Sequence, residues 1–148
     1  MQLIRAMPDD WPAVAALVQR AYGKWVPVIG RFPKPMTVDY RTAVINNRID
    51  LLHTEGVLGG LIETLLEPGC LLVVNVAVDP RHQKSGYGRL LMQHAEDLAR
   101  SAGLRVLRLY TNKLMSMNIR LYEKLGFERY ERKDSEEGDN LVHMRKPL

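Results

Sequence analysis

The chain has 148 residues and no linker, internal repeat or long charge block, so residues 1–148 are predicted to form one domain. Hydrophobic residues make up 46% and charged residues 26% of the sequence, which is typical of soluble globular proteins and excludes disordered and low-complexity chains. The net charge of +4 suits anionic ligands, and the single cysteine, Cys70, excludes an intrachain disulfide framework and favours a reducing, cytoplasmic setting.

Hydrophobic periodicity predicts strands and helices in the order βααβββαβαββ. The first elements are a strand over residues 2–5, a helix capped by Asp9 and Asp10, and a helix over residues 38–46. Three strands follow over residues 49–53, 57–66 and 71–78, the first two joined by a tight turn at residues 54–56. The last elements are a helix over residues 86–102, a strand over 105–110, a helix over 116–124, and strands over 127–132 and 140–146 around a polar turn at 133–139.

Two segments carry further structural information. Three prolines and a glycine lie between residues 25 and 36, and they predict a firm loop that contains no helix. The strand over residues 71–78 is apolar on both faces, which predicts a place in the middle of a covered sheet. Its apolar run is the longest in the chain and is far shorter than the roughly 20 residues that cross a bilayer, so no membrane partner is expected.

The segment over residues 76–89 predicts an anion site, because a buried strand ends there, turns through a glycine-bearing loop and begins the best-defined helix. Gly86 and Gly88 let the backbone approach a ligand closely, and the first turn of a helix presents unpaired N–H groups to an anion. Three basic residues add positive charge: Arg81, Lys84 and Arg89. The alternative is a plain helix start after a loop of solvated basic residues. Neither a GxGxxG nor a GxxxxGK[ST] pattern is present, so a Rossmann site and a P-loop are not supported.

Two motifs resemble those of the GCN5-related N-acetyltransferase (GNAT) superfamily. Gln83-x-x-Gly86-x-Gly88 is similar to the superfamily's acetyl-CoA signature, Gln/Arg-x-x-Gly-x-Gly/Ala, and the stretch from Leu121 to Phe127 is similar to its Leu-Tyr-x-Lys-x-Gly-Phe pattern. The predicted order of elements is also that of the superfamily. The resemblance implies a GNAT-type α/β acyl-CoA N-acyltransferase fold, with a mixed, mostly antiparallel sheet of about seven strands, flanked by about four helices and splayed near residues 71–78.

The resemblance also implies roles for individual residues. Tyr122 matches the general acid that protonates the thiolate of coenzyme A as it leaves, although a half-buried helix aromatic is the alternative. Asn118 lies one helical turn earlier, where its amide could bind the pantetheine arm or simply start the helix. The residues implied to bind acetyl-CoA are Val76, Ala77, Val78, Gln83, Lys84, Ser85, Gly86, Tyr87, Gly88, Arg89, Asn118 and Tyr122.

The sequence departs from the superfamily in two places. Many members have Asn seven residues before the tyrosine and Ala four before it, where this chain has Met115 and Asn118. No residue is an obvious general base, so a water relayed through Asn75 or the Asn75 carbonyl is expected to take the proton of the amine. Glu63 and His53 are weaker candidates, and each is expected to be structural or to face solvent.

The acceptor site is expected over the proline-rich stretch between the first two helices. Trp25, Phe32 and Tyr40 could form an apolar wall and Arg31 an anion-binding point, which would suit a small amine that carries a carboxylate. The alternative is a packed lid with a solvated arginine.

The sequence therefore predicts an N-acetyltransferase that joins the acetyl group of acetyl-CoA to a primary amine of a small molecule or peptide, by direct attack in a ternary complex. A catalytically silent CoA-binding module or sensor is the alternative. No metal is expected, because the histidines lack ligand spacing, and no nucleic acid, because the basic residues form no stripe interleaved with aromatics. A homodimer through an exposed edge of the closing strands is a further prediction.

Overall fold

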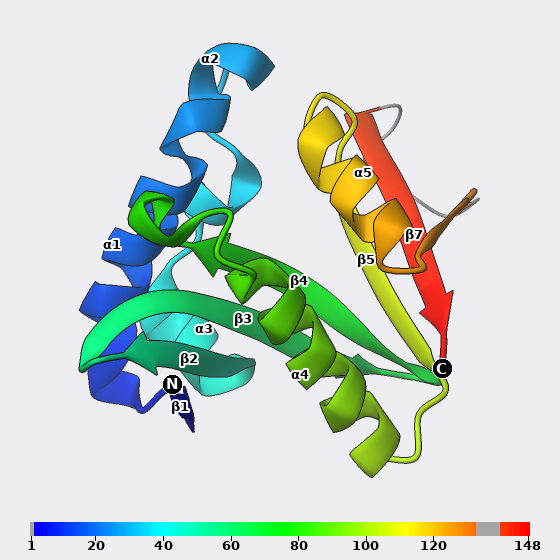
Figure 1. The fold of residues 1–148 in the computed structure, drawn as a ribbon, viewed down its shortest axis with the longest axis horizontal. Helices are drawn as coiled ribbons and strands as arrows, with labels where there is room; N and C mark the ends of the chain where they lie inside the picture. Colours follow the sequence, from blue (N-terminus) through cyan, green and yellow to red (C-terminus); the bar gives the residue numbers. More distant parts are fainter. Residues whose placement is uncertain (1, 133–139) are drawn as a thin grey trace.

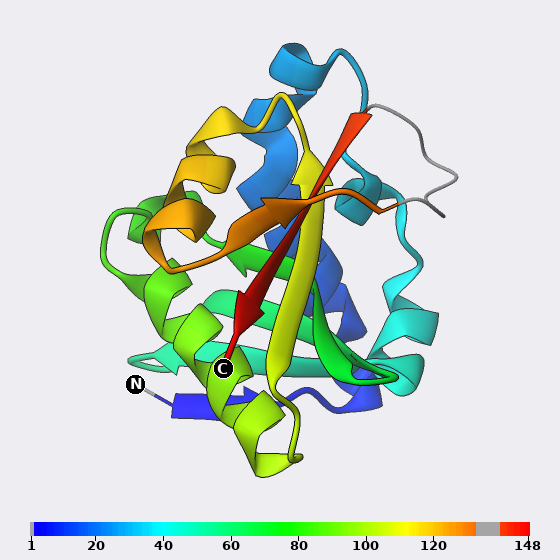
Figure 2. The same cartoon turned by 90° about the vertical axis from the view of Figure 1, so that its right-hand side faces the viewer.

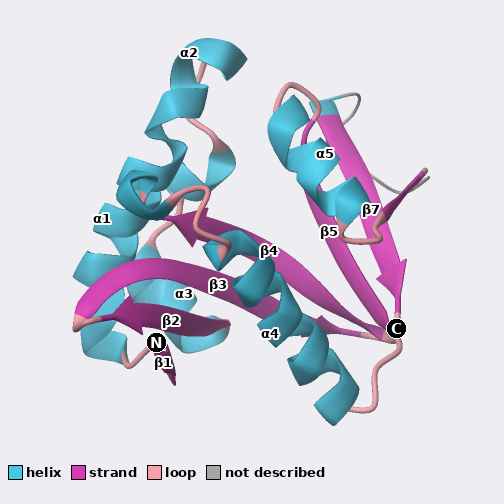
Figure 3. Ribbon diagram, viewed as in Figure 1, coloured by secondary structure: helices cyan, strands magenta, loops and turns pink. Residues whose placement is uncertain are grey.

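Seven strands pair in one sheet with the order β1-β2-β3-β4-β5-β7-β6 in the computed structural model, which describes residues 2–132 and 140–148 (Figures 1 and 3). The strands are β1 (Gln2–Arg5), β2 (Arg48–Thr54), β3 (Val57–Glu67), β4 (Cys70–Val78), β5 (Val106–Asn112), β6 (Glu128–Tyr130) and β7 (Leu141–Pro147). The pairs that the structure describes are all antiparallel except β4 with β5. This confirms the predicted mixed, mostly antiparallel sheet.

The α-helices cover both faces of the sheet (Figure 2). They are α1 (Trp11–Tyr22), α2 (Val26–Ile29), α3 (Tyr40–Asn46), α4 (Tyr87–Ser101) and α5 (Ser116–Lys124), and the 3-10 turns are η1 (Pro8–Asp10), η2 (Gly23–Trp25), η3 (Lys34–Thr37) and η4 (Pro80–His82). One buried cluster joins α1 and α3 to the sheet, and a second joins α4 and α5 to the other face. No helix in the described part of the chain is long and apolar enough to span a membrane.

Most predicted boundaries lie within two residues of those observed, and one prediction is wrong. The segment over residues 25–36 was expected to contain no helix, yet Val26–Ile29 forms the single turn of α2. Pro27 lies in its first turn, where a helix needs no N–H donor, and Gly30 ends it with a φ of 83°. The predicted turn at residues 133–139 lies outside the described residues.

The structure also locates the predicted hairpin turn at residues 54–56 and the sheet edge at the closing strands. Glu55 and Gly56, with φ values of 53° and 76°, form the turn between β2 and β3, and two successive positive values are typical of a two-residue hairpin loop. At the other end of the sheet β7 lies between β5 and β6. An edge-to-edge dimer through the closing strands would therefore use β6, which is only three residues long.

The two halves of the sheet meet along a short contact between β4 and β5. Only Leu71–Val73 of β4 pairs with Leu107–Leu109 of β5, and the strands separate beyond these residues. Where they separate, Glu63 of β3 pairs with Asn75 while Thr64 pairs with Val73, so Val74 is an extra residue in β4. Such a bulge bends its strand and increases its local twist. The sheet is thus splayed at β4, as predicted (Figure 1).

Candidate active site

A cavity of about 390 Å³ fills the opening between β4 and β5. Its walls come from the ends of both strands, from α5 and from the segment that runs from α2 to α3. The predicted site residues that line it are Arg31, Phe32, Tyr40, Asn75, Val76, Asn118 and Tyr122. Residues distant in sequence are therefore brought together by the divergence of two strands.

Asp79 holds the loop that leaves β4 in place. Its Oδ1 accepts a hydrogen bond of 2.9 Å from the Arg81 backbone N–H, and Arg81 Nε lies 3.1 Å from the same oxygen. Arg20 of α1 donates from Nε to Oδ2 at 3.0 Å. The Asp79 carboxylate is almost fully buried, and these bonds, those from Arg81 first, hold its pKa well below the ordinary range for aspartate. The loop is thereby anchored to α1.

The start of α4 offers backbone donors to an anion, as the sequence predicts. Gly86 precedes the helix with a φ of 84° and supplies no side-chain cap, and the first intrahelical bond runs from the Leu90 N–H to the Gly86 carbonyl. The N–H groups of Tyr87, Gly88 and Arg89 therefore have no partner within the helix. A Cβ added at Gly86 would meet nothing within 4 Å. The backbone at Gly86 thus borders open space beside these donors, as an anion site at a helix start requires.

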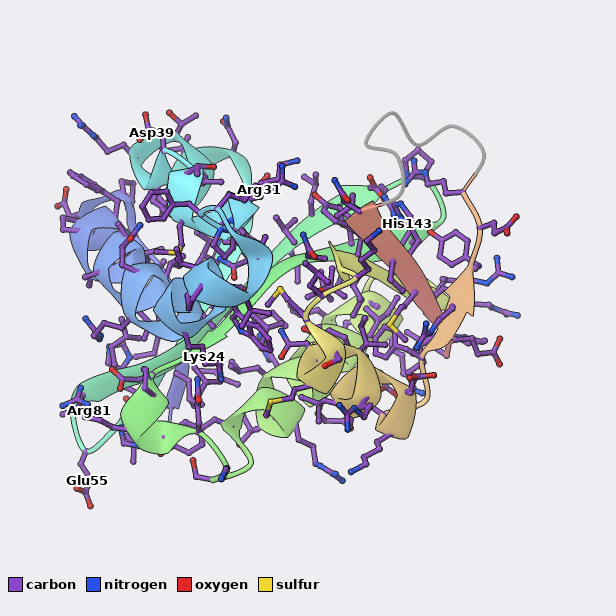
Figure 4. The ribbon with its side chains drawn as sticks, turned by 90° about the horizontal axis from the view of Figure 1, so that it is seen from above. Lys24, Arg31, Asp39, Glu55, Arg81 and His143 are labelled. Carbon is purple, nitrogen blue, oxygen red and sulfur yellow. The ribbon has the colours of Figure 1, made fainter. Side chains whose placement is uncertain are left out.

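Side chains in the same loop stabilise it instead of pointing at a ligand. Gln83 donates from Nε2 to the Val78 carbonyl at 3.4 Å and accepts from Lys24 Nζ at 3.0 Å. Ser85 donates to the His82 carbonyl. The Tyr87 ring is buried and stacks on His82, with ring centroids 5.2 Å apart. Lys84 and Arg89 stay exposed, and Figure 4 shows Lys24 and Arg81 on the same side of the molecule. Ligand contacts of Gln83, Ser85 and Tyr87 would thus come from their backbone.

Asn75 is fixed in the cavity wall by two tyrosines. The Tyr22 hydroxyl donates to Asn75 Oδ1 at 2.7 Å and lies 3.0 Å from the Val76 carbonyl oxygen. Asn75 Nδ2 donates to the Tyr40 hydroxyl at 3.2 Å, which donates in turn to the Pro35 carbonyl at 2.7 Å. Burial raises the pKa of both tyrosines well above the ordinary value, so both stay protonated. Sequence reasoning missed Tyr22, because helical periodicity marks only the core positions of α1.

Glu63 is a second residue to which sequence reasoning gave too little weight. It was expected to be structural or to face solvent, and the second alternative is excluded, because Glu63 is only 2% exposed and lines the cavity from β3. Asn47 Nδ2 donates to its Oε2 at 2.8 Å, and Asn75 pairs with it across the strands. Burial raises the pKa of Glu63, against hydrogen bonds from Asn47 and Asn75 that lower it. A charged residue inside an apolar strand was the available sequence signal. His53 lies on β2 and does not line the cavity.

Tyr122 presents a phenol to the cavity from α5. Its side chain is partly buried, with its ring edge-on to Phe127 at a centroid distance of 5.9 Å. Burial raises the pKa of Tyr122 to about 12, so the hydroxyl keeps its proton at neutral pH. That hydroxyl forms no hydrogen bond with any residue that the structure describes, which leaves its proton available to a ligand. Asn118 lines the cavity on the same helix, and Met115 is buried with its sulfur 3.6 Å from Thr111 Oγ1.

The expected acceptor residues divide into three that line the cavity and one that does not. Arg31, Phe32 and Tyr40 line it, and Phe32 is 62% exposed. Trp25 is buried at 7% exposure, is absent from the lining, and has Lys24 Nζ 5.5 Å from its ring centroid. Figure 4 shows Arg31 on one side of the opening and His143 of β7 on the other. An apolar wall with a cation beside it is therefore present without Trp25.

A metal centre is not formed by the residues that the structure describes, since no three side chains of His, Cys, Asp or Glu come together among residues 2–132 and 140–148. The polar groups that line the cavity include phenols, amides, one buried carboxylate and the cations of Arg31 and Lys34. These groups can move protons and orient a polar or charged ligand.

Comparison with known proteins shows that residues 38–127 match the model of the acetyltransferase (GNAT) family. The [ribosomal protein bS18]-alanine N-acetyltransferase of Escherichia coli K12 is 42% identical over 53 residues, which is 36% of this chain and 36% of that protein. The match therefore spans about a third of this curated relative.

Solved structures extend the likeness to nearly the whole chain. The ribosomal-protein-S18-alanine N-acetyltransferase of Escherichia coli superimposes with a TM-score of 0.77 and 25% identity, over 99% of this chain and 92% of that one. The PaiA N-acetyltransferase of Thermoplasma acidophilum, solved in complex with coenzyme A, has a TM-score of 0.80 and 16% identity over 100% of both chains. The second likeness concerns the fold alone.

Proposed function

Since the chain belongs to the GNAT family of acetyltransferases, we propose that it transfers the acetyl group of acetyl-CoA to a primary amine, which attacks the thioester directly in a ternary complex. The observation that carries the proposal is the end of β4 beyond Val73, which pairs with β3 but has no partner on its β5 side. It runs from the cavity that holds Tyr122 towards the free N–H groups at the start of α4. One continuous surface thus offers a backbone edge, an anion site and a proton donor.

Acetyl-CoA is held along this surface by the backbone. The edge of β4 at Val76, Ala77 and Val78 has no β5 partner and pairs with the amide groups of the pantetheine arm. The N–H groups between Gly86 and Arg89 hold the diphosphate, with Lys84 and Arg89 exposed beside them. The bound molecule supplies an acetyl group activated as a thioester.

Tyr122 acts as the general acid in the proposed reaction. The amine nitrogen forms a bond to the thioester carbonyl carbon, and the carbon–sulfur bond then breaks. Tyr122 donates its proton to the departing thiolate, for which its protonated, unbonded hydroxyl is suited. Asn75, fixed by Tyr22 and Tyr40, orients the water that relays the proton of the amine.

The acceptor is a primary amine that carries a carboxylate or a peptide carbonyl next to it. Arg31 lies at the cavity as an exposed cation, and Phe32 and Tyr40 add apolar surface. A peptide α-amine has the same chemistry, and the Escherichia coli relative is named for acetylation of an alanine of ribosomal protein bS18. The dipeptide L-alanyl-L-alanine carries a peptide α-amine and a carboxylate, so it serves as the probe.

Calorimetric titration with acetyl-CoA tests the binding site, using Gly88→Glu with Gly88→Ala as its matched control. A Cβ at Gly88 lies 3.8 Å from Leu121 Cδ2, an ordinary contact, so alanine is tolerated. The glutamate places a carboxylate at the diphosphate and is expected to weaken binding about tenfold or more. Equal affinity in both variants would contradict the proposed site. Tight binding without thiol release on any primary amine would support the silent CoA-binding module instead.

A further inference from the structure

Glu63 is a buried carboxylate that lines the proposed reaction cavity and is not part of an ion pair with any described residue. Its residue is 2% exposed and lines the same cavity as Tyr122. Its hydrogen-bond partners are the neutral amides of Asn47 and Asn75. Within the part of the chain that the structure describes, no lysine, arginine or histidine forms an ion pair with it. Burying an unpaired charge is costly, and such groups are concentrated at functional sites.

The groups that face Glu63 from neighbouring elements do not neutralise it either. Tyr22 of α1 and Tyr40 of α3 lie near enough for Glu63 to disfavour their ionised forms. Tyr110 and Tyr122 are the other titratable groups of the cavity wall, and Arg31 and Lys34 are its cations. Glu63 is the only carboxylate among the described residues that line the cavity.

We propose that Glu63 is the proton acceptor for the acceptor amine, reached directly or through one water oriented by Asn75. The inference rests on the proposed acetyl transfer and names the group that this reaction still lacks. An aliphatic amine with a pKa near 10 is about one part in a thousand neutral at pH 7, so a base must take its proton. Glu63 pairs with Asn75 across β3 and β4, and the bulge at Val74 lies next to this pair.

The protons balance in the following way. The ammonium group of the acceptor gives one proton to the Glu63 carboxylate, and its nitrogen then bonds to the thioester carbon. As the carbon–sulfur bond breaks, the nitrogen loses a second proton to water and the thiolate receives one from Tyr122. Water exchange restores Glu63 and Tyr122. The net change is an ammonium and a thioester converted to an amide, a thiol and one proton released to solvent.

A purely structural role is the competing interpretation, because Glu63 also holds Asn47, the residue that ends α3. Glu63→Gln separates the two roles. Glutamine keeps an oxygen that accepts from Asn47 Nδ2, so the fold and acetyl-CoA affinity are retained, but it cannot accept a proton at neutral pH. Glu55→Gln is the matched control, since Glu55 is exposed in the hairpin turn and points away from the opening (Figure 4).

Thiol release from acetyl-CoA is measured against pH with L-alanyl-L-alanine and Nα-acetyl-L-lysine as acceptors. For Glu63→Gln we expect kcat/KM about 100-fold lower at neutral pH, with unchanged acetyl-CoA affinity. The rate of the variant should then rise about tenfold per pH unit, as the amine itself loses its proton. The wild type and Glu55→Gln should instead lose activity only on the acid side, where Glu63 becomes protonated.

The outcomes distinguish the two proposals. Wild-type rate and pH profile in Glu63→Gln would overturn the role of Glu63 and leave the acetyl transfer standing. Acetyl-CoA binding without thiol release from either amine would overturn the transfer proposal, and the inference with it. A readout that needs no acceptor is the carboxyl carbon resonance of Glu63, assigned by its loss in Glu63→Gln and followed against pH. A carboxyl group that is still protonated at neutral pH would also overturn the inference, because it could not accept the proton of the amine.

Discussion

At the scale of single residues, burial acts on two side chains that face one cavity. Tyr122 keeps its proton because burial disfavours the phenolate, and burial likewise raises the pKa of Glu63 above the ordinary value for glutamate. The cavity thus brings together a phenol as proposed proton donor and a carboxylate as proposed proton acceptor. The motif predicted the position of Tyr122, and only its burial and unbonded hydroxyl show how it could act.

Tyr122→Phe removes the proposed proton donor and little else. The ring keeps its edge-on contact with Phe127, so folding and acetyl-CoA affinity should be unchanged. We expect kcat to fall about 100-fold, because a thiolate leaves without a positioned acid. Stopped-flow measurement of thiol release under saturating acetyl-CoA checks this. Wild-type turnover in the variant would rule out Tyr122 as the general acid.

Asp79 should make the stability of the protein depend on pH. Its pKa is depressed in the folded state, so its contribution is full above the unfolded value of about 3.9 and is lost as pH falls from there towards the folded pKa. Asp79→Asn should lower the free energy of unfolding by about 1–3 kcal/mol at pH 7. Urea unfolding at neutral and at acidic pH measures both values. An undiminished gap between variant and wild type in acid would contradict the assignment.

At the scale of elements, the site depends on how β4 ends its pairing with β5. The parallel contact covers three residue pairs, and the bulge at Val74 lies at the point where it stops. The glycines of β3 shape the other side of the site. A Cβ at Gly59 would lie 3.0 Å from Tyr87 Cε2 and 3.3 Å from His82 Cδ2. The loop before α4 thus packs on a strand that has no side chain there.

Gly59→Ala should displace that loop. Tyr87 is buried and bonded to Thr54 through its hydroxyl at 2.8 Å, so its ring cannot easily swing away from a new methyl group. We expect a loss of about 1–3 kcal/mol in stability and a several-fold weaker affinity for acetyl-CoA. Thermal unfolding and calorimetry measure the two effects. Gly23→Ala is the control, because its Cβ meets nothing within 4 Å, and a similar loss there would remove the steric explanation.

At the scale of the whole molecule, two halves are joined through the short contact of β4 with β5. A ligand that lies along the free edge of β4 and reaches α5 contacts both halves. Such a ligand stabilises the folded state as a whole, because it binds the assembled cleft and not the unfolded chain.

Acetyl-CoA should therefore raise the melting temperature. At 100 times its dissociation constant the ligand adds about 2.7 kcal/mol, which corresponds to about 5–10 °C for a chain of this size. Differential scanning fluorimetry measures the shift. With tenfold weaker binding, Gly88→Glu should gain only about 1.4 kcal/mol at the same concentration, about half the wild-type shift. An unshifted wild type at saturation would contradict binding to the folded cleft.

The sequence alone determined the order of elements, the central place of β4 and the glycine loop before α4, because these depend on local periodicity and on backbone freedom. It also determined the position of Tyr122 through a motif. Only the tertiary structure decided that Tyr22, Asn75 and Tyr40 form one hydrogen-bonded chain and that Trp25 lies outside the cavity. The burial of Glu63 was likewise decided there. Burial and hydrogen bonding depend on which strands diverge and which helix covers the gap, and no local pattern encodes either.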